Sequence, residues 1–411
     1  MRYPTKYEFW LVVLMFFSWG TVFLDRMSLI YLAPFIAPEL HLNNTDIGLL
    51  VSALALAWAV SGLVFGAISD RLGRRPVLIP AFFLFSVLSW ISGVVKTLGQ
   101  LFAIRTLMGV AEGPTWSTIT ATIEESSAPE RRGRNVGVVV SAAALVGLAL
   151  APVLTTQVAA RWGWRAAFLV AGVPGIVIGI LLWKFVRESG ESKPAAHGKP
   201  SWSSYVSLLR HRNIWLCCLG SAGFMTWLFV MNAFAPLYIT EVSKNSATTA
   251  GLIMGASGLG AFVWGFVLPW MSDRKGRKPI LLFIALVSAF VPLTYQIPLL
   301  IRHTWLMAAA GLVANGGQGI AALTLVLIPT ESVGAEFAAT AIGLATLVGE
   351  VFGGTLAPAV AGEVADHFGL AAPLWIAAAG ALSVFIAALF MHETAPCKVT
   401  RQPSAVAVPS V

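Results

Sequence analysis

The stretch SDRLGRRP, Ser69–Pro76, recurs almost unchanged as SDRKGRKP, Ser272–Pro279. The two copies begin 203 residues apart, which is about half of the 411-residue chain. A weaker echo follows each copy, since Glu125–Ser126 recurs as Glu331–Ser332. Repetition of one basic loop at corresponding places predicts that the chain consists of two halves with the same order of elements.

The sequence around these loops is too apolar for a water-soluble protein. Hydrophobic residues make up 57% of the chain and charged residues only 11%, and the mean hydropathy is +0.80. Uncharged runs long enough to cross a bilayer, about 20 residues, alternate with short polar loops. We therefore predict an all-α polytopic membrane protein with twelve transmembrane helices in two pseudo-symmetric halves of six helices each. The expected division is an N-terminal half over 1–187, a cytoplasmic linker over 188–210, a C-terminal half over 211–393 and a disordered cytoplasmic tail over 394–411.

Lysine and arginine residues gather on one side of the predicted membrane. The N-terminus, the tail and the loops after every second helix hold 20 of the 27 basic residues, whereas the opposite loops hold 5. By the positive-inside rule, this bias predicts that both termini are cytoplasmic and that the chain spans the cytoplasmic (inner) membrane. The net charge of +8 is thus a topology signal, and no nucleic-acid partner is expected.

Four ionisable residues fall inside predicted helices, where each charge costs roughly 2.5–3.5 kcal/mol on insertion scales. Asp25 and Arg26 interrupt the first helix. Arg105 and Glu112 are seven residues apart in the fourth helix, so they share one face of it. Counting from the helix ends puts Glu112 at the depth of Asp25 and Arg26. Charges at membrane depth typically mark a path for a substrate or for protons.

These motifs resemble those of a known family. The two loop copies are similar to the signature loop of the major facilitator superfamily, and the resemblance covers the whole chain. Within that superfamily, FLDR at 23–26, Arg105 with the EGP at 112–114, and GWR at 163–165 resemble the anion:cation symporter family. The resemblance implies proton-carrying acids on the first and fourth helices and an arginine that contacts the substrate carboxylate. It also implies that the loops control conformational exchange through Asp70, Arg71, Gly73, Arg74, Asp273, Arg274, Gly276 and Arg277.

The charged residues suit these roles chemically. An arginine fork donates two hydrogen bonds to a carboxylate and keeps its charge, so Arg26 is the expected anchor and Arg105 the second candidate. Arg105 could instead extend to the nearby membrane surface. Asp25 and Glu112 are expected to carry the coupling protons, because a carboxyl group in a low-dielectric cavity can exchange its proton near neutral pH. Alternatively, Asp25 and Arg26 form a static pair that holds the first helix in place.

The second half has fewer charges at membrane depth. Glu350 lies mid-helix among glycines, and it either bonds a neighbouring helix or forms a further proton-coupling site. Asn232, Asn315 and Gln318 are uncharged hydrogen-bonding residues at a depth that suits substrate contact. Most tryptophans are expected at the membrane interfaces, whereas Trp58, in the middle of the second helix, is expected in the cavity.

The predicted function is secondary active transport, namely proton-coupled symport (uptake) of a small organic carboxylate by alternating access. An organic anion or organophosphate exchanger is the alternative, but the second half lacks a mid-membrane arginine or lysine. A proton-driven efflux pump for cationic drugs is disfavoured by Arg26, and a non-transporting sensor by the short tail. The apolar second half favours an aromatic or short monocarboxylate over a sugar acid.

Other classes of protein lack support in the sequence. Signature motifs of zinc hydrolases, serine hydrolases and phosphate-binding enzymes do not occur, so an enzyme with catalytic residues is not expected. Cys217, Cys218 and Cys397 do not have metal-ligand spacing, and neither a metal nor a cofactor is expected. The expected partners are the organic anion, protons and the lipid bilayer, and the chain is expected to act as a monomer.

Overall fold

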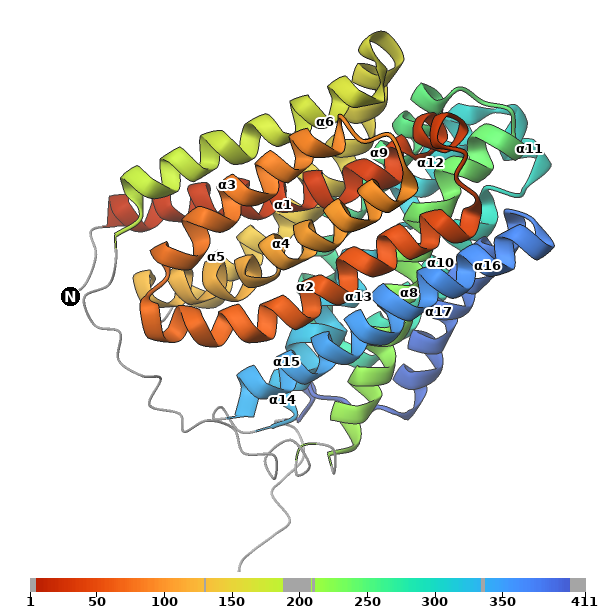
Figure 1. The fold of residues 1–411 in the computed structure, drawn as a ribbon. Helices are drawn as coiled ribbons and strands as arrows, with labels where there is room; N and C mark the ends of the chain where they lie inside the picture. The colour runs from red at the N-terminus through yellow and green to blue at the C-terminus, as the bar shows by residue number, and fades with distance from the viewer. Residues whose placement is uncertain (1–4, 129–130, 188–207, 209–210, 334–336, 400–411) are drawn as a thin grey trace, which may run out of the picture.

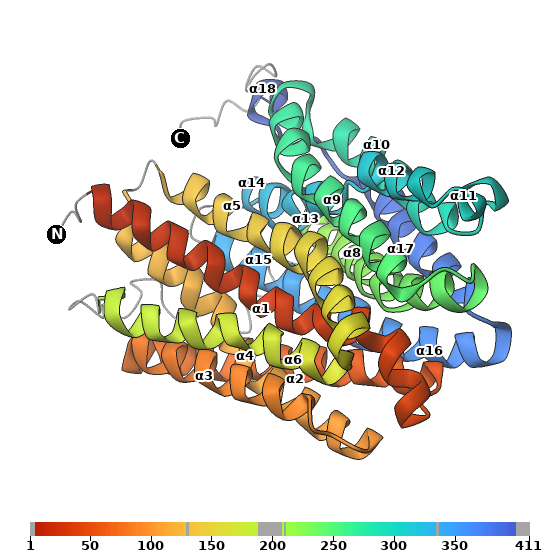
Figure 2. The ribbon, with the colours of Figure 1, turned by 90° about the horizontal axis from the view of Figure 1, so that it is seen from above.

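The computed structural model describes residues 5–128, 131–187, 208, 211–333 and 337–399. Every regular element in this part is a helix, and the long helices run across the molecule roughly side by side (Figure 1). Seen from above, the helices of the first half and those of the second half form two adjacent groups (Figure 2). The predicted all-helical architecture is therefore confirmed.

The first group contains the helices up to residue 185. They are α1 (Thr5–Leu40), α2 (Asn44–Leu72), α3 (Arg75–Ser92), α4 (Leu98–Ser126), α5 (Arg132–Ala142), the π-helical η2 (Ala143–Leu150) and α6 (Ala151–Phe185). Gly163 breaks α6 with a φ of +82°, a conformation that glycine adopts without strain. Apolar side chains, among them Phe82, Met108 and Phe168, fill the space between these helices.

The second group begins at residue 212. Its long helices are α8 (Arg212–Leu237), α9 (Ala247–Lys275), α10 (Arg277–Thr294) and α17 (Ala371–Phe390). Shorter segments follow one another between them: η3 (Tyr238–Val242), α11 (Pro298–Arg302), α12 (Thr304–Ala314), α13 (Gly317–Ala321), η4 (Ala322–Leu327), α14 (Ile328–Glu331), α15 (Ala338–Val348), η6 (Gly349–Leu356) and α16 (Ala357–Phe368). The elements η3, η4 and η6 are π-helical turns.

Ten helices among the described residues are long and apolar enough to cross a membrane. One of these spans, Arg132–Phe185, contains the break at Gly163. Helix α4, which carries Arg105 and Glu112, is not among the ten. The chain is thus a multi-pass membrane protein, and the number of twelve spans stays a prediction.

The segments outside the two groups are only partly described. The predicted linker over 188–210 lies outside the described residues except for Leu208. The first residues of the predicted tail are ordered and end in helix α18 (Pro396–Val399), whereas the tail was expected to be disordered. The reason is Glu393, whose carboxylate accepts hydrogen bonds from the backbone amides of Thr394 and Ala395 and from that of Arg277 in α10. Residues 400–411 lie outside the described residues.

The two loop copies fold alike. Gly73 ends α2 with a φ of +98° and Gly276 ends α9 with a φ of +108°. Each glycine amide donates a hydrogen bond to the carbonyl oxygen of the serine four residues earlier. A side chain at either position would be strained, so both copies need glycine at this place.

One arginine of each loop copy pairs with the glutamate of the weaker echo that follows it. Arg74 pairs with Glu125 at 2.8 Å, and Arg277 pairs with Glu331 at 2.7 Å. The two repeats in the sequence therefore correspond to matching contacts within each half. Arg71 and Arg274 are exposed at the helix ends, and the side chain of Asp70 lies outside the described part of the chain. A role of these loops in conformational exchange stays a prediction.

The two groups of helices also meet at the end opposite the loop copies. Asp366 of α16 accepts hydrogen bonds from the backbone amides and side chains of Asn44 and Thr45 at the start of α2, at 2.6–3.0 Å. The helices α2 and α16 lie side by side along this contact (Figure 1). A Cβ atom at Gly48 would overlap the carbonyl oxygen of Pro358, so glycine permits the close approach. The two groups of helices are therefore in direct contact at this end.

We expect Asp366→Ala to loosen this contact. The substitution removes the acceptor of four hydrogen bonds, so it should raise the population open at this end several-fold. Spin labels at the exposed His41 and Phe368 report the separation of α1 and α16 by pulsed electron resonance. The control His367→Ala removes contacts with Glu363 and Phe368, both within α16, and should leave the distances unchanged. Identical distance distributions in Asp366→Ala and wild type would exclude a latch at this contact.

Candidate functional site

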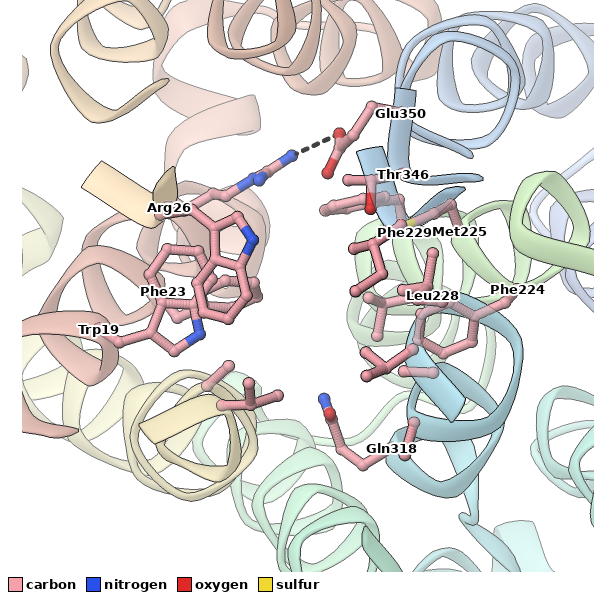
Figure 3. A pocket seen from close by; sticks show the side chains of 18 of the residues that line it. Trp19, Phe23, Arg26, Phe224, Met225, Leu228, Phe229, Gln318, Thr346 and Glu350 are labelled. Carbon is pink, nitrogen blue, oxygen red and sulfur yellow. Dashed lines mark hydrogen bonds and ion pairs between the residues drawn. The ribbon is translucent and has the colours of Figure 1, made fainter. Parts of the chain in front are cut away.

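A buried ion pair joins the two groups of helices near the middle of the bundle. Nη2 of Arg26 in α1 lies 3.1 Å from Oε2 of Glu350 in η6, and both side chains are 4% exposed. The two side chains reach toward each other from opposite walls (Figure 3). Glu350 stands in a π-helical turn, a type of distortion that often occurs at functional sites.

A cavity borders this ion pair. Its empty volume, which includes space open to solvent, is about 820 Å³. The residues that line it come from both halves, and they include Trp19, Phe23, Trp58, Trp116, Val140, Phe224, Met225, Leu228, Phe229, Gln318, Ile342 and Thr346. Trp19 and Trp116 lie between the ion pair and the end with the loop copies, as the course of α1 and α4 requires. The wall therefore extends from the ion pair toward the end that is predicted to face the cytoplasm.

Aromatic rings surround the guanidinium group of Arg26. The ring centroids of Phe229, Trp58 and Phe23 lie 4.6, 5.2 and 5.9 Å from its Cζ atom. Each ring face attracts the cation, which stabilises a charge that lies far from bulk water. The indole Nε1 of Trp58 is buried, and it has no hydrogen-bond partner among the described residues.

A second group of charged residues lies behind Arg26, between α1 and α4. Asp25 and Glu112 are fully buried and interact with each other and with Arg105. Nη2 of Arg105 donates a hydrogen bond to the backbone carbonyl oxygen of Arg26 at 2.9 Å. The carboxyl oxygen atoms of Asp25 and Glu112 are buried, and the two carboxyl groups lie close to each other.

The composition of this charged cluster has an electrostatic consequence. Two guanidinium groups, of Arg26 and Arg105, face three carboxyl groups, of Asp25, Glu112 and Glu350. With every group ionised, the buried cluster would carry one net negative charge. An uncompensated buried charge is strongly unfavourable, so neutrality requires one proton on the carboxyl groups. A substrate carboxylate that enters the cluster requires one more.

The structure places the predicted site residues in three different settings. Arg26, Trp58, Gln318 and Glu350 line the cavity. Arg105 is 1% exposed and lies behind Arg26, so it does not extend to the membrane surface. Asn232 and Asn315 are absent from the cavity wall and are already bonded: the Asn232 Oδ1 accepts a hydrogen bond from Tyr31 and the Asn315 Nδ2 donates one to Ser257.

Several wall residues were missed by the sequence interpretation. Trp19 and Trp116 lie 4.7 Å apart between ring centroids and form part of the wall, together with Thr346 from α15. The position of Trp19 on the face of α1 that carries Arg26 was a usable signal, because Trp19, Phe23 and Arg26 follow at spacings of four and three residues. The pairing of Arg26 with Glu350 had no such signal, since 324 residues separate the two.

Comparison with known proteins gives matches along nearly the whole chain. Residues 14–354 match the sequence profile described as Major Facilitator Superfamily. The chain is 26% identical to the hexuronate transporter of Bacillus subtilis (strain 168), over 91% of this chain and 92% of that protein. It is 27% identical to the probable 4-methylmuconolactone transporter of Cupriavidus pinatubonensis (strain JMP 134 / LMG 1197), over 86% of this chain and 83% of that protein.

Solved structures share the fold. A crystal structure of a bacterial homologue of the human lysosomal transporter Spinster, in an inward-facing and occupied conformation, matches with a TM-score of 0.73. The match covers 94% of this chain and 97% of that chain at 18% sequence identity. This likeness extends to the arrangement of the helices in both halves.

Proposed function

Because the chain belongs to the Major Facilitator Superfamily, we propose that it imports a small organic carboxylate together with protons. The relatives above are named as transporters of hexuronate and 4-methylmuconolactone, which supports an organic anion as the substrate. The proposed location is the cytoplasmic membrane, with both termini in the cytoplasm, as the distribution of basic residues favours. The chain works as a transporter and not as an enzyme.

The single observation that carries this proposal is the surplus of buried carboxyl groups over guanidinium groups. Asp25, Glu112 and Glu350 outnumber Arg26 and Arg105, and all five residues are buried. A bound carboxylate adds one more negative charge, so binding and protonation support each other. This coupling is the thermodynamic requirement for a symporter of anions and protons.

In the proposed cycle, the substrate binds by replacing Glu350 in the ion pair with Arg26. Before the substrate binds, the carboxylate of Glu350 pairs with the guanidinium group of Arg26. The substrate carboxylate takes this place when Glu350 accepts a proton, because a neutral carboxyl group no longer competes for Arg26. Asp25 and Glu112 share the other proton, the one that keeps the cluster neutral before the substrate enters. Release toward the cavity mouth restores the ion pair.

The test uses the purified full-length protein in liposomes that contain a pH-sensitive dye. With an acidic exterior, we expect an organic acid to accumulate inside and the interior to acidify with it, and a protonophore should abolish the accumulation. Liposomes without protein are the control. Uptake that needs a preloaded internal anion and leaves the internal pH unchanged would instead establish an exchanger.

A further inference from the structure

The wall of the cavity offers few polar groups. Apart from the indole N–H groups, the lining side chains with hydrogen-bonding atoms are Arg26, Gln318, Thr346 and Glu350, and Arg26 and Glu350 bind each other. A sugar acid carries a hydroxyl group on most of its carbon atoms. Each hydroxyl group buried without a partner lowers affinity about tenfold or more. The cavity therefore disfavours a polyhydroxylated acid.

Aromatic side chains face each other across the cavity. On one side, the ring centroid of Trp19 lies 4.7 Å from that of Trp116 and 5.0 Å from that of Phe23. Phe224 and Phe229 of α8 lie on the other side (Figure 3). Aromatic rings pack favourably against one another in offset or edge-to-face geometry. A ligand with a flat ring therefore fits between these two walls.

A carboxylate-binding end adjoins these walls. The guanidinium group of Arg26 lies beside the ring of Trp58, whose buried Nε1 lacks a hydrogen-bond partner in the part of the chain that the structure describes. Burying an N–H donor without a partner is unfavourable, so a ligand that accepts from it gains affinity. A ligand carboxylate that displaces Glu350 can bind Arg26 through one oxygen atom and accept a hydrogen bond from the N–H group of Trp58 through the other.

The charge of this end limits the ligand to one carboxylate. Glu350 belongs to the wall beside Arg26, so a second carboxylate of the ligand would meet like charge in a low-dielectric site. The other carboxyl groups, of Asp25 and Glu112, lie behind Arg26 and add to this repulsion. The wall contributes no further guanidinium or ammonium group among the described residues.

We propose that the site selects a small aromatic monocarboxylate, with its carboxylate on Arg26 and Trp58 and its ring between the two aromatic walls. This inference rests on the proposed transport of organic carboxylates and narrows it to one class. It assigns Trp58 a binding role through its N–H group, in addition to its contact with Arg26.

The test compares ligands on the wild-type protein by titration calorimetry and by uptake into liposomes. Phenylacetate is expected to bind about tenfold or more tightly than D-glucuronate and than the dicarboxylate terephthalate. Benzyl alcohol, which keeps the ring but lacks the carboxylate, is expected to bind far more weakly than phenylacetate. D-glucuronate or terephthalate binding as tightly as phenylacetate would overturn this inference while leaving carboxylate transport intact. If none of the acids is bound or transported, the proposed function fails with it.

A pair of matched substitutions tests the role of Trp58. Trp58→Phe keeps an aromatic ring and removes the N–H donor, so phenylacetate affinity should fall about tenfold. Trp305→Phe, at a residue that is 67% exposed, is the control and should bind like wild type. Equal affinity of Trp58→Phe and wild type, with both folded, would remove Trp58 from the site. Should Trp58→Phe not fold, the comparison of phenylacetate with benzyl alcohol still decides whether the carboxylate is recognised.

Discussion

Glu112→Gln is expected to reduce uptake driven by a pH gradient to background while substrate binding stays within a few-fold of wild type. Glutamine has the shape of a protonated glutamic acid but cannot release a proton, so the coupled cycle stops after binding. Glu112 is fully buried in α4, and its carboxyl group interacts with Asp25 and Arg105. The substitution therefore removes a titratable group and keeps the size and shape of the side chain.

The measurement pairs pH-jump uptake with counterflow in liposomes, because exchange of labelled for unlabelled substrate does not require net proton release. Asp25→Asn should behave like Glu112→Gln, since the two carboxyl groups act as one cluster. Glu124→Gln, in the same helix α4 but nearer its end, is the control and should transport normally. Intact gradient-driven accumulation in both Glu112→Gln and Asp25→Asn would leave these acids as structural partners of the arginines.

Arg26→Lys is expected to weaken substrate binding about tenfold or more. Lysine keeps the positive charge but loses the planar fork that binds a carboxylate through two donors. It also has a different contact with the rings of Trp58 and Phe229, which lie over the guanidinium group. Equilibrium binding of the purified protein measures this loss, and its folding is checked by thermal unfolding.

Two further arginine-to-lysine substitutions test whether the loss of binding is specific to Arg26. Arg302→Lys, at an exposed residue of α11, should bind like wild type. Arg105→Lys should disturb binding less than Arg26→Lys, because Arg105 lies behind the cavity wall and donates to the backbone of Arg26. If Arg105→Lys abolishes binding and Arg26→Lys does not, the two arginines must exchange roles.

The repeat and the hydrophobic runs were sufficient to predict the helical architecture, because both depend on local sequence. The echoes at Glu125 and Glu331 were visible as well, yet their contacts with Arg74 and Arg277 were not proposed. Pairing required knowledge that the end of α2 meets the end of α4 in space. Sequence spacing alone does not contain this information.

Residue counts along a helix predicted which site residues lie at the same depth. They did not predict which side chains face the cavity, because that depends on how the helices pack. Asp25 and Glu112 were expected at one depth from residue counts, and they lie together. Asn232 and Asn315 also have suitable depth, but their side chains bond Tyr31 and Ser257 rather than line the cavity. Rotation of a helix about its axis decides this difference, and the neighbouring helices set that rotation.

The central claim is that a substrate carboxylate and protons share one buried cluster. The most direct test mixes the purified protein with substrate in weakly buffered solution and records the pH with an indicator dye. The account predicts that binding takes up protons from solution, and that Glu112→Gln combined with Glu350→Gln binds substrate with much less proton uptake. Substrate binding that takes up no protons anywhere between mildly acidic and mildly alkaline pH would contradict the account.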